Sequence, residues 1–395
     1  MDHLAELKEF ALLHARGQGM APRRAARILA GITNDTPGHP ESWTTVWTRA
    51  GRTAAAYGHH LDACAHFALA RFPHHGDPAR EAAGRLLVST FDTWRRRRDD
   101  IERLELPFPD GTLACWATGL DAARPRPLLV VMGGIVSVKE QWAPVLPLLR
   151  RLGFAAVVTE FPGVGENPLR HGPDSWGLLP GLLDRLAGRA RVADTSMLAL
   201  SFSGHLALRA AVEDPRIRRI LTVGAPVGDF FTDEEWRPRV PGITVDTLTR
   251  LTGLADADAL WRELPRHALT EDELSRVRIP VRYVASSRDE IIPPGERRLL
   301  SALPDLRVKT YDDVHGSPAH LGAMRRWLVR QLLLTRIGAR TPAPAPATPD
   351  PIVTHRTVSD PTVSDPTVAE TTASDSTTSG TTAPGTTALK SLTRE

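Results

Sequence analysis

The fold is decided by the stretch Met197-Leu198-Ala199-Leu200-Ser201-Phe202-Ser203-Gly204-His205. An apolar run typical of a buried strand leads into Ser201, and a helical pattern begins within three residues of it. Such a sharp strand-to-helix turn presents a serine hydroxyl above the edge of a sheet. It needs small residues two positions before and after the serine, because neighbouring backbone passes close by. Ala199 and Ser203 stand at these positions, so we predict Ser201 as a nucleophile.

Ser203 is the rival nucleophile in this stretch. Its own position two residues further on is His205, whose imidazole would crowd the turn. Ser201 therefore fits better. The segment taken alone also allows a strand-helix connection that carries no chemistry.

A serine hydroxyl needs a base, and the base needs an acid to orient it. Turns of this kind are followed along the chain by the acid and then by the histidine. Asp289 follows the apolar strand predicted at 281–285, and His315 follows the strand predicted at 306–311. We predict these two residues as acid and base, with Asp229 as the less favoured acid. Of the neighbours, Glu290 is expected to point elsewhere and His320 to lie on a helix face.

Backbone N–H groups should stabilise the negative charge that develops on an attacked carbonyl oxygen. One is expected from Phe202, directly after the predicted nucleophile. The other is expected from the turn after the strand 128–132, at Gly134 or Ile135. This Gly-Gly pair is not a phosphate loop, since no Gly-Lys-Ser/Thr follows it. Gly163 and Gly165 lack the third glycine of a dinucleotide site. No cofactor and no metal ion is expected.

Apolar strands alternate with helical segments through residues 101–337. Residues 102–118 suggest a β-hairpin, and later strands are predicted at 128–132, 154–159, 196–200, 220–223, 281–285 and 306–311. Helices are predicted near 139–152, 174–190, 204–213, 295–303 and 318–335. The alternation indicates an α/β fold, a mostly parallel central sheet with helices on both faces. Residues 228–278 interrupt it and suggest an inserted cap.

The two ends of the chain differ from this central part. Residues 1–100 have apolar and aromatic residues at helical spacing and predict a helical N-terminal cap domain. Residues 338–395 are rich in Thr, Ser, Pro, Ala and Asp, and predict a disordered tail.

Charge and composition exclude several classes of protein. The 395 residues hold 49 Lys plus Arg against 46 Asp plus Glu, too even a balance to indicate nucleic-acid binding. No run approaches the roughly 18 apolar residues of a membrane span, and no signal peptide is visible. The two cysteines, Cys64 and Cys115, lie in apolar stretches and are expected in the core. We therefore expect a cytoplasmic protein that acts on a small molecule.

The sequence resembles the α/β-hydrolase superfamily, and within it the FrsA-like branch that includes the 2,6-dihydropseudooxynicotine hydrolases. The resemblance covers about 40–336. Its motifs are the stretch 41–47 with Trp43 and Trp47, the stretch 63–72 with Phe67 and Phe72, Gly133-Gly134 with Lys139-Glu140, the segment 160–166, the turn at Ser201, Asp289 and His315. The branch usually has Gly where Ala199 and Ser203 stand, and an acidic residue where Ile135-Val136 stand.

The resemblance implies a helical domain over a catalytic α/β domain, often as a homodimer, with a role in secondary metabolism or catabolism. The leading hypothesis is a serine hydrolase that cleaves an acyl bond (ester, thioester or activated carbon–carbon bond) of a bulky, largely apolar or aromatic molecule. A second is that the same residues serve elimination or acyl transfer. A third is a non-catalytic binding protein on this scaffold.

Overall fold

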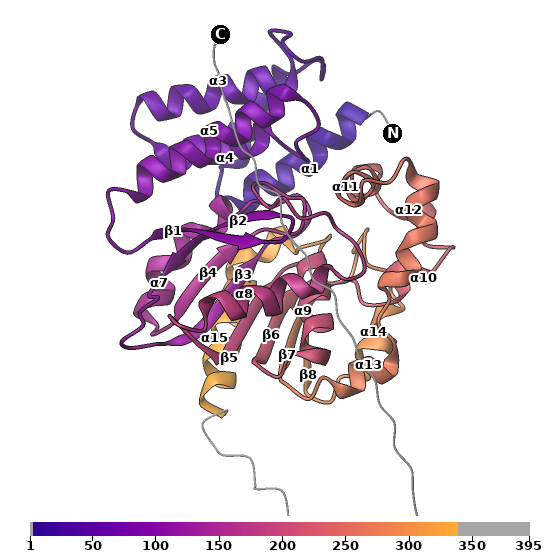
Figure 1. Cartoon of the computed structure of the whole chain (residues 1–395). Helices are drawn as coiled ribbons and strands as arrows, with labels where there is room; N and C mark the ends of the chain where they lie inside the picture. The colour runs from indigo at the N-terminus through magenta and orange to yellow at the C-terminus, as the bar shows by residue number, and fades with distance from the viewer. Residues whose placement is uncertain (1–2, 339–395) are drawn as a thin grey trace, which may run out of the picture. The chain divides into compact units, whose positions relative to one another are not determined.

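The computed structural model describes residues 3–338 and is built around one eight-stranded sheet (Figure 1). The strand order is β1-β2-β4-β3-β5-β6-β7-β8. The strands are β1 Glu102–Phe108, β2 Gly111–Thr118, β3 Pro127–Met132, β4 Ala155–Thr159, β5 Arg191–Ala199, β6 Ile217–Val223, β7 Val281–Ser286 and β8 Leu306–Tyr311. β1 and β2 form the predicted hairpin, β2 pairs antiparallel with β4, and β3 to β8 are parallel. The predicted α/β fold class is confirmed.

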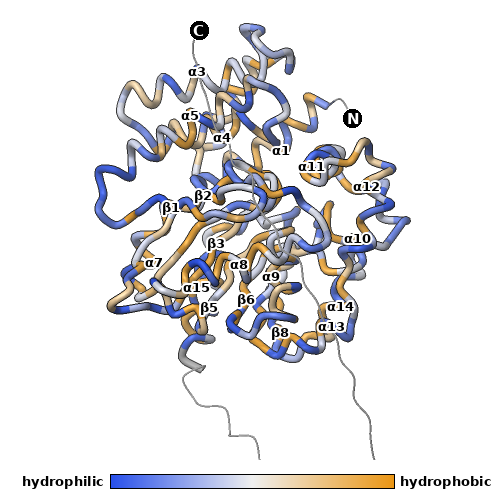
Figure 2. The backbone as a smooth tube through the Cα atoms, in the orientation of Figure 1, coloured by the Kyte–Doolittle hydropathy of each residue, from blue (hydrophilic) through white to orange (hydrophobic). Residues whose placement is uncertain are grey.

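Burial along the strands explains their apolar composition. Every residue of β3 and β4 is buried, because helices cover both faces of the sheet at these strands. The edge strand β8 differs, since most of its residues are partly or fully exposed. In Figure 2 the tube at β3 is accordingly drawn in the orange of hydrophobic residues.

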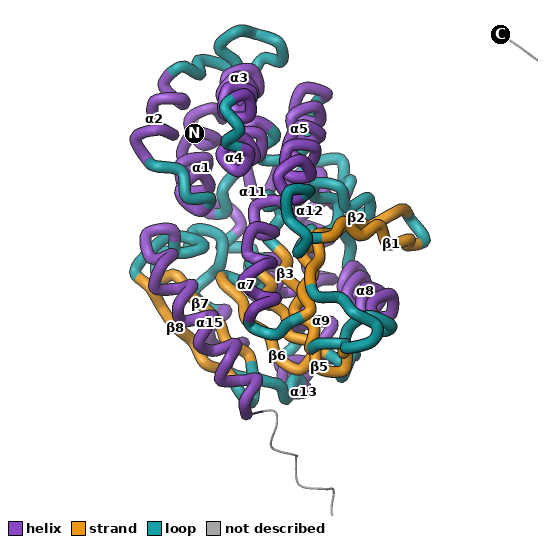
Figure 3. Tube along the Cα trace, turned by 90° about the vertical axis from the view of Figure 1, so that its left-hand side faces the viewer, coloured by secondary structure: helices purple, strands orange, loops and turns teal. Residues whose placement is uncertain are grey.

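Helices lie on both faces of the sheet (Figure 3). One face is covered by α7 (Leu146–Arg151) and α15 (Leu321–Gly338), and the other by α8 (Leu178–Leu186) and α9 (Phe202–Glu213). The helix predicted near 139–152 is broken into α6 (Lys139–Trp142), a 3-10 turn and α7. Pro144 and Pro147 explain the break, because proline cannot donate the backbone hydrogen bond of a helix interior.

Five helices precede the sheet and pack together as a helical leader, residues 3–95 (Figure 1). They are α1 His3–Gly17, α2 Pro22–Ala30, α3 Trp43–Ala56, α4 His60–Ala70 and α5 Pro78–Arg95. Trp43 and Trp47 are fully buried in the leader's own apolar cluster. Phe91 of α5 instead packs on Trp116 of β2, with ring centroids 4.9 Å apart. The apolar core is thus continuous from the leader into the sheet.

The predicted insertion is also helical. It contains α10 Asp229–Thr232, α11 Gly242–Thr252, α12 Ala257–Glu263 and α13 Glu271–Arg276, before α14 Glu296–Leu300. Cys64 and Cys115 are buried thiols, as expected. The predicted disordered tail, 338–395, lies outside the described residues except for Gly338, the last residue of α15. Among the described helices, none is both long and apolar enough to cross a membrane.

Replacing Phe91 with alanine tests the packing between leader and sheet. The side chain is fully buried, so Phe91→Ala should lower the free energy of unfolding by about 3–5 kcal/mol. Urea unfolding followed by tryptophan fluorescence measures this. Tyr57→Ala, at a side chain that is 77% exposed, is the control and should change the free energy by less than about 0.5 kcal/mol. Equal effects of the two substitutions would contradict the packing.

Candidate active site

Ser201 occupies a strained turn between β5 and α9. Its φ is 55° and its ψ −132°, in a region that residues other than glycine rarely adopt. The backbone N–H of Ser201 donates to the carbonyl of Val223 on β6 at 2.8 Å, which fixes the turn to the sheet. Gly204 permits the close approach of α9, because a Cβ at this position would lie 2.1 Å from Thr222 Oγ1. The turn predicted from the sequence is present in the structure.

The structure brings the three predicted side chains together. Ser201 Oγ lies 3.0 Å from His315 Nε2, and His315 Nδ1 lies 2.9 Å from Asp289 Oδ1. A carboxylate only accepts hydrogen bonds, so Nδ1 carries the proton that is donated to Asp289. Nε2 is then free to accept the hydroxyl proton of Ser201. This is the arrangement of nucleophile, base and orienting acid in which a serine can be activated.

Hydrogen bonds from backbone N–H groups hold both Asp289 and His315 in place. Asp289 Oδ1 accepts from the N–H groups of Ile291 and Ile292 at 3.0 and 2.9 Å. The N–H of His315 donates to Glu290 Oε2 at 2.9 Å. The expectation that Glu290 points elsewhere is wrong, because its carboxylate holds the histidine backbone and borders the same cavity.

Two opposing effects set the protonation of His315. Burial favours the neutral ring, while the negative charges of Asp289 and Glu290 favour the imidazolium. The carboxylates prevail, so the pKa of His315 lies above the ordinary value of 6.5. An imidazole of this kind is a stronger base than histidine in water.

Gly224 makes room for the imidazole and was not singled out in the sequence. It follows β6 with φ 58°, and a Cβ there would lie 2.7 Å from His315 Cε1. Its position directly after an apolar strand was the available signal. Any side chain at this position would both strain the backbone and displace the base.

The predicted oxyanion donors lie beside the serine. Gly134 follows β3, and a Cβ there would lie 3.0 Å from Ser201 Cβ, so the loop passes very close to the nucleophile. Phe202 is the first residue of α9, and its N–H therefore has no acceptor within the helix. Within the described residues the N–H of Ile135 has no backbone partner either. Arg71, buried at the end of α4, donates to the carbonyl of Val136 and ties this loop to the leader.

The alternative candidates for nucleophile, base and acid make other contacts. Ser203 is fully buried and donates its hydroxyl to the carbonyl of Gly133. His320 pairs with Asp313 at 3.0 Å and stacks on Tyr311. Asp229 begins α10, where its carboxylate lies beside Gly295.

An apolar cavity of about 200 Å³ opens over Ser201 and His315. Apolar side chains dominate its lining: Phe10, Leu13, Phe72, Ile135, Val136, Leu200, Val223, Ile243, Ile291, Leu321 and Met324. Residues from α1 and α11 take part, so leader and insertion both cover the site. Of the tryptophans in the described part of the chain, Trp142 alone borders this cavity. Trp43 and Trp47 of the leader, in contrast, are buried in the leader's own apolar cluster.

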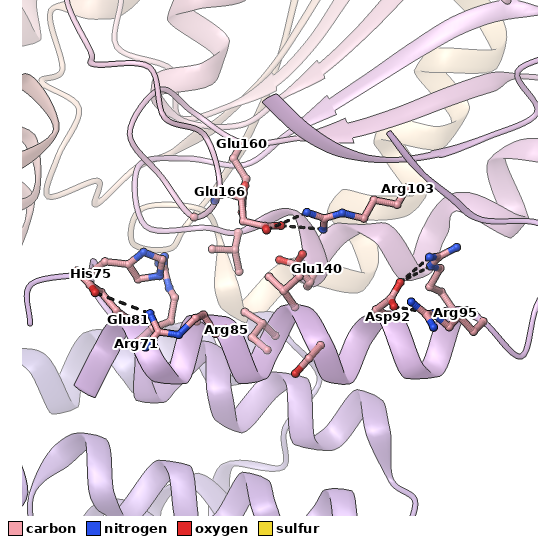
Figure 4. Close-up of a pocket in the computed structure, with 17 residues that line it drawn as sticks. Arg71, His75, Glu81, Arg85, Asp92, Arg95, Arg103, Glu140, Glu160 and Glu166 are labelled. Carbon is pink, nitrogen blue, oxygen red and sulfur yellow. Dashed lines mark hydrogen bonds and ion pairs between the residues drawn. The ribbon is translucent and has the colours of Figure 1, made fainter. Parts of the chain in front are cut away.

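A second cavity, of about 570 Å³, lies between α5 and the residues Arg103, Glu140, Glu160 and Glu166, and most of its lining residues are charged (Figure 4). At its floor Glu166 forms two hydrogen bonds with Arg103, at 2.9 and 3.0 Å, and one with Lys139 at 2.7 Å. Lys139 is fully buried and also lies 3.0 Å from Glu140 and 3.2 Å from Glu160. Burial opposes its charge, but these three carboxylates hold the pKa of Lys139 above its ordinary value. None of the predicted catalytic residues borders this cavity, so the apolar cavity is the candidate active site.

Comparison with known structures finds the same fold in two solved proteins. The chain is 51% identical to the solved structure of AbyA5 wild type, with a TM-score of 0.82 over 85% of this chain and 95% of that one. The fold is also similar to that of a 2,6-dihydroxy-pseudo-oxynicotine hydrolase. There the identity is 19% and the TM-score 0.64, over 84% of this chain and 98% of the other.

Comparison with known sequences identifies the family. The esterase FrsA of Vibrio vulnificus strain YJ016 is 20% identical over 323 residues, covering 75% of this chain and 77% of the esterase. That of Citrobacter koseri is 25% identical over 256 residues, 62% of each chain. The family model described as esterase FrsA-like matches residues 43–307. Because this match spans more than half of the chain, the protein belongs to the FrsA-like esterase family and is a hydrolase.

Proposed function

We propose that this hydrolase cleaves an acyl bond through a covalent intermediate on Ser201. The observation that carries the proposal is the continuous chain of contacts from Ser201 Oγ through His315 to Asp289, at the floor of an apolar cavity. The arrangement matches what a serine nucleophile requires on physical grounds.

The reaction proceeds in two halves. Ser201 Oγ attacks the acyl carbonyl carbon as His315 Nε2 takes the hydroxyl proton. The bond to the leaving group then breaks, and His315 returns the proton to that group. Water attacks the acyl-enzyme with the same proton transfers, which releases the acid and regenerates the serine. Asp289 orients the imidazole and stabilises its cationic form throughout.

Negative charge on the attacked oxygen needs donors that are already in place. We assign this role to the N–H of Phe202 and to that of Ile135, with Gly134 allowing the loop to approach. Each such donor contributes about 3 kcal/mol to stabilisation of the transition state. Arg71 and Ser203, which both bind carbonyls of this loop, act as positioning residues.

The lining of the cavity indicates which class of substrate would bind. Aliphatic and aromatic side chains from α1, α11 and the loops favour a bulky, largely apolar or aromatic small molecule. The volume of about 200 Å³ is below the usual range of about 300–1,000 Å³ for ligand pockets. We infer that one part of the substrate is enclosed and the remainder extends outwards.

Replacement of Ser201 tests the covalent mechanism. Ser201→Ala should lower turnover of an acyl ester by about 10⁴-fold or more, because the attacking oxygen is lost. A fluorophosphonate probe should add one adduct to the unaltered protein and none to Ser201→Ala, measured by intact mass. Ser275→Ala, at the surface of α13, is the control and should retain both properties.

Hydrolysis in H₂¹⁸O completes the test. The isotope should enter the acid product, since water attacks the acyl-enzyme. Near-normal turnover by Ser201→Ala, or product acid without the isotope, would refute hydrolysis through a serine ester.

The pH dependence tests the role of His315. The base works when neutral, so kcat/KM should rise with pH and level off above the pKa of His315, which lies above 6.5. Asp289→Asn removes a charge that raises this pKa. The midpoint should therefore move to lower pH, and the plateau should fall by up to about 10⁴-fold.

Asp312→Asn, at an exposed carboxylate near the same loops, is the matched control and should leave the midpoint in place. A midpoint that stays unchanged in Asp289→Asn would show that the observed group is not a histidine held by Asp289.

A further inference from the structure

One face of α1 forms a wall of the candidate active site. Phe10, Leu13, His14 and Gly17 border the cavity, at the three- and four-residue spacing of a single helical face, and Gln18 directly after the helix also borders it. A different face of α1 is buried in the leader through Leu7, Ala11 and Ala15. The leader thus contributes a defined set of side chains to the site.

His14 is the titratable member of this set. Its ring packs against the buried ring of Phe72, with centroids 4.8 Å apart, which restricts its orientation. Within the described part of the chain its side chain has no hydrogen-bond partner. Two neighbouring polar residues of the lining do have one: Gln18 donates to the carbonyl of His14, and Gln141 accepts from the N–H of Val138.

The surroundings of His14 keep its ring neutral. Burial is the main cause, and the positive charges of Arg71 and His315 add to it, so that the pKa of His14 falls to about 4. A neutral imidazole has one nitrogen that donates and one that accepts a hydrogen bond. At neutral pH, His14 therefore offers an N–H that has no acceptor among the described residues, beside the apolar side chains of Phe10 and Leu13.

We propose that His14 is a substrate-binding residue that donates a hydrogen bond to a second oxygen of the substrate, distinct from the oxygen of the attacked carbonyl. The substrate class becomes an acyl compound whose apolar body carries a further carbonyl, ether or enol oxygen. This inference rests on the proposed function, since it assumes that the substrate occupies the cavity above Ser201.

A preference for such substrates is expected because leaving the buried N–H of His14 without a hydrogen bond is unfavourable. An imidazole N–H that an apolar ligand covers without replacing its hydrogen bond to water costs about 1–3 kcal/mol. A substrate with an oxygen opposite this N–H avoids the cost. Discrimination between otherwise identical substrates should therefore be about 10-fold or more in kcat/KM.

Matched pairs of esters test the proposal with the full-length protein. Each pair consists of an aryl-alkanoate ester with one chain CH₂ replaced by a ketone, and its parent without the ketone; the ketone position varies along the series. The wild-type protein should prefer at least one keto ester over its parent by about 10-fold or more in kcat/KM. His14→Phe keeps a ring against Phe72 but lacks the N–H, and should bring that ratio close to one.

Leu13→Ala is the control, since Leu13 borders the same cavity without a polar group. It should change both esters of a pair alike and leave the ratio intact. Thermal melting of each variant verifies that it is folded. An unchanged ratio in folded His14→Phe, or no preference by the wild-type protein at any ketone position, overturns the proposal.

Failure of the proposed function is recognised separately. If the fluorophosphonate probe does not label Ser201 in the wild-type protein, the serine mechanism fails. The proposed role of His14 is then tested without catalysis, by calorimetric measurement of the affinity for non-hydrolysable analogues of each pair, one with and one without the ketone. Tighter binding of the ketone that is lost in His14→Phe supports the subsite, and equal binding rejects it.

Discussion

The left-handed backbone of Ser201 is the constraint on which the rest of the site depends. A positive φ of 55° is energetically unfavourable for serine, and the turn keeps this conformation because contacts with neighbouring segments hold it. The carbonyl of Val223 binds its N–H from β6, and α9 starts against Thr222 at a glycine. This turn places the Ser201 hydroxyl at the carboxyl edge of the sheet, where the loops after β7 and β8 begin. Asp289 and His315 reach it from those two loops.

The helical leader is part of the site's architecture as well as a cover over it. Arg71 holds the loop after β3 from the end of α4, and α1 supplies one wall of the cavity. Below the same loop, Lys139 is buried among three carboxylates, an arrangement that is stable only while every charge keeps its partner. The loop of the predicted oxyanion donors is therefore anchored on both sides. Substitutions in the leader, far away in sequence, are expected to alter the geometry at Ser201.

The errors in the sequence-based expectations share a physical origin. The single helix expected near 139–152 is broken at Pro144 and Pro147, a local signal that was present but outweighed by the apolar pattern. Glu290 could not be placed from sequence, because adjacent residues in a loop after a strand can point in any direction. In the predicted cap domain, Trp43 and Trp47 pack inside the leader and do not border the cavity over Ser201. Hydrophobicity alone does not distinguish a core from a binding surface.

The sequence by itself determined the order of strands and helices, the turn at Ser201, and the chain order of serine, acid and base. These are local properties: the period of apolar residues, the small residues around a tight turn, and the polar residues that follow each strand. Only the tertiary structure decided that α1 borders the cavity, that Gly224 makes room for the imidazole, and that the His14 side chain faces the site with no hydrogen-bond partner among residues 3–338. These features depend on contacts between segments as far apart as residues 14 and 315, and no local pattern encodes which distant side chain fills a given space.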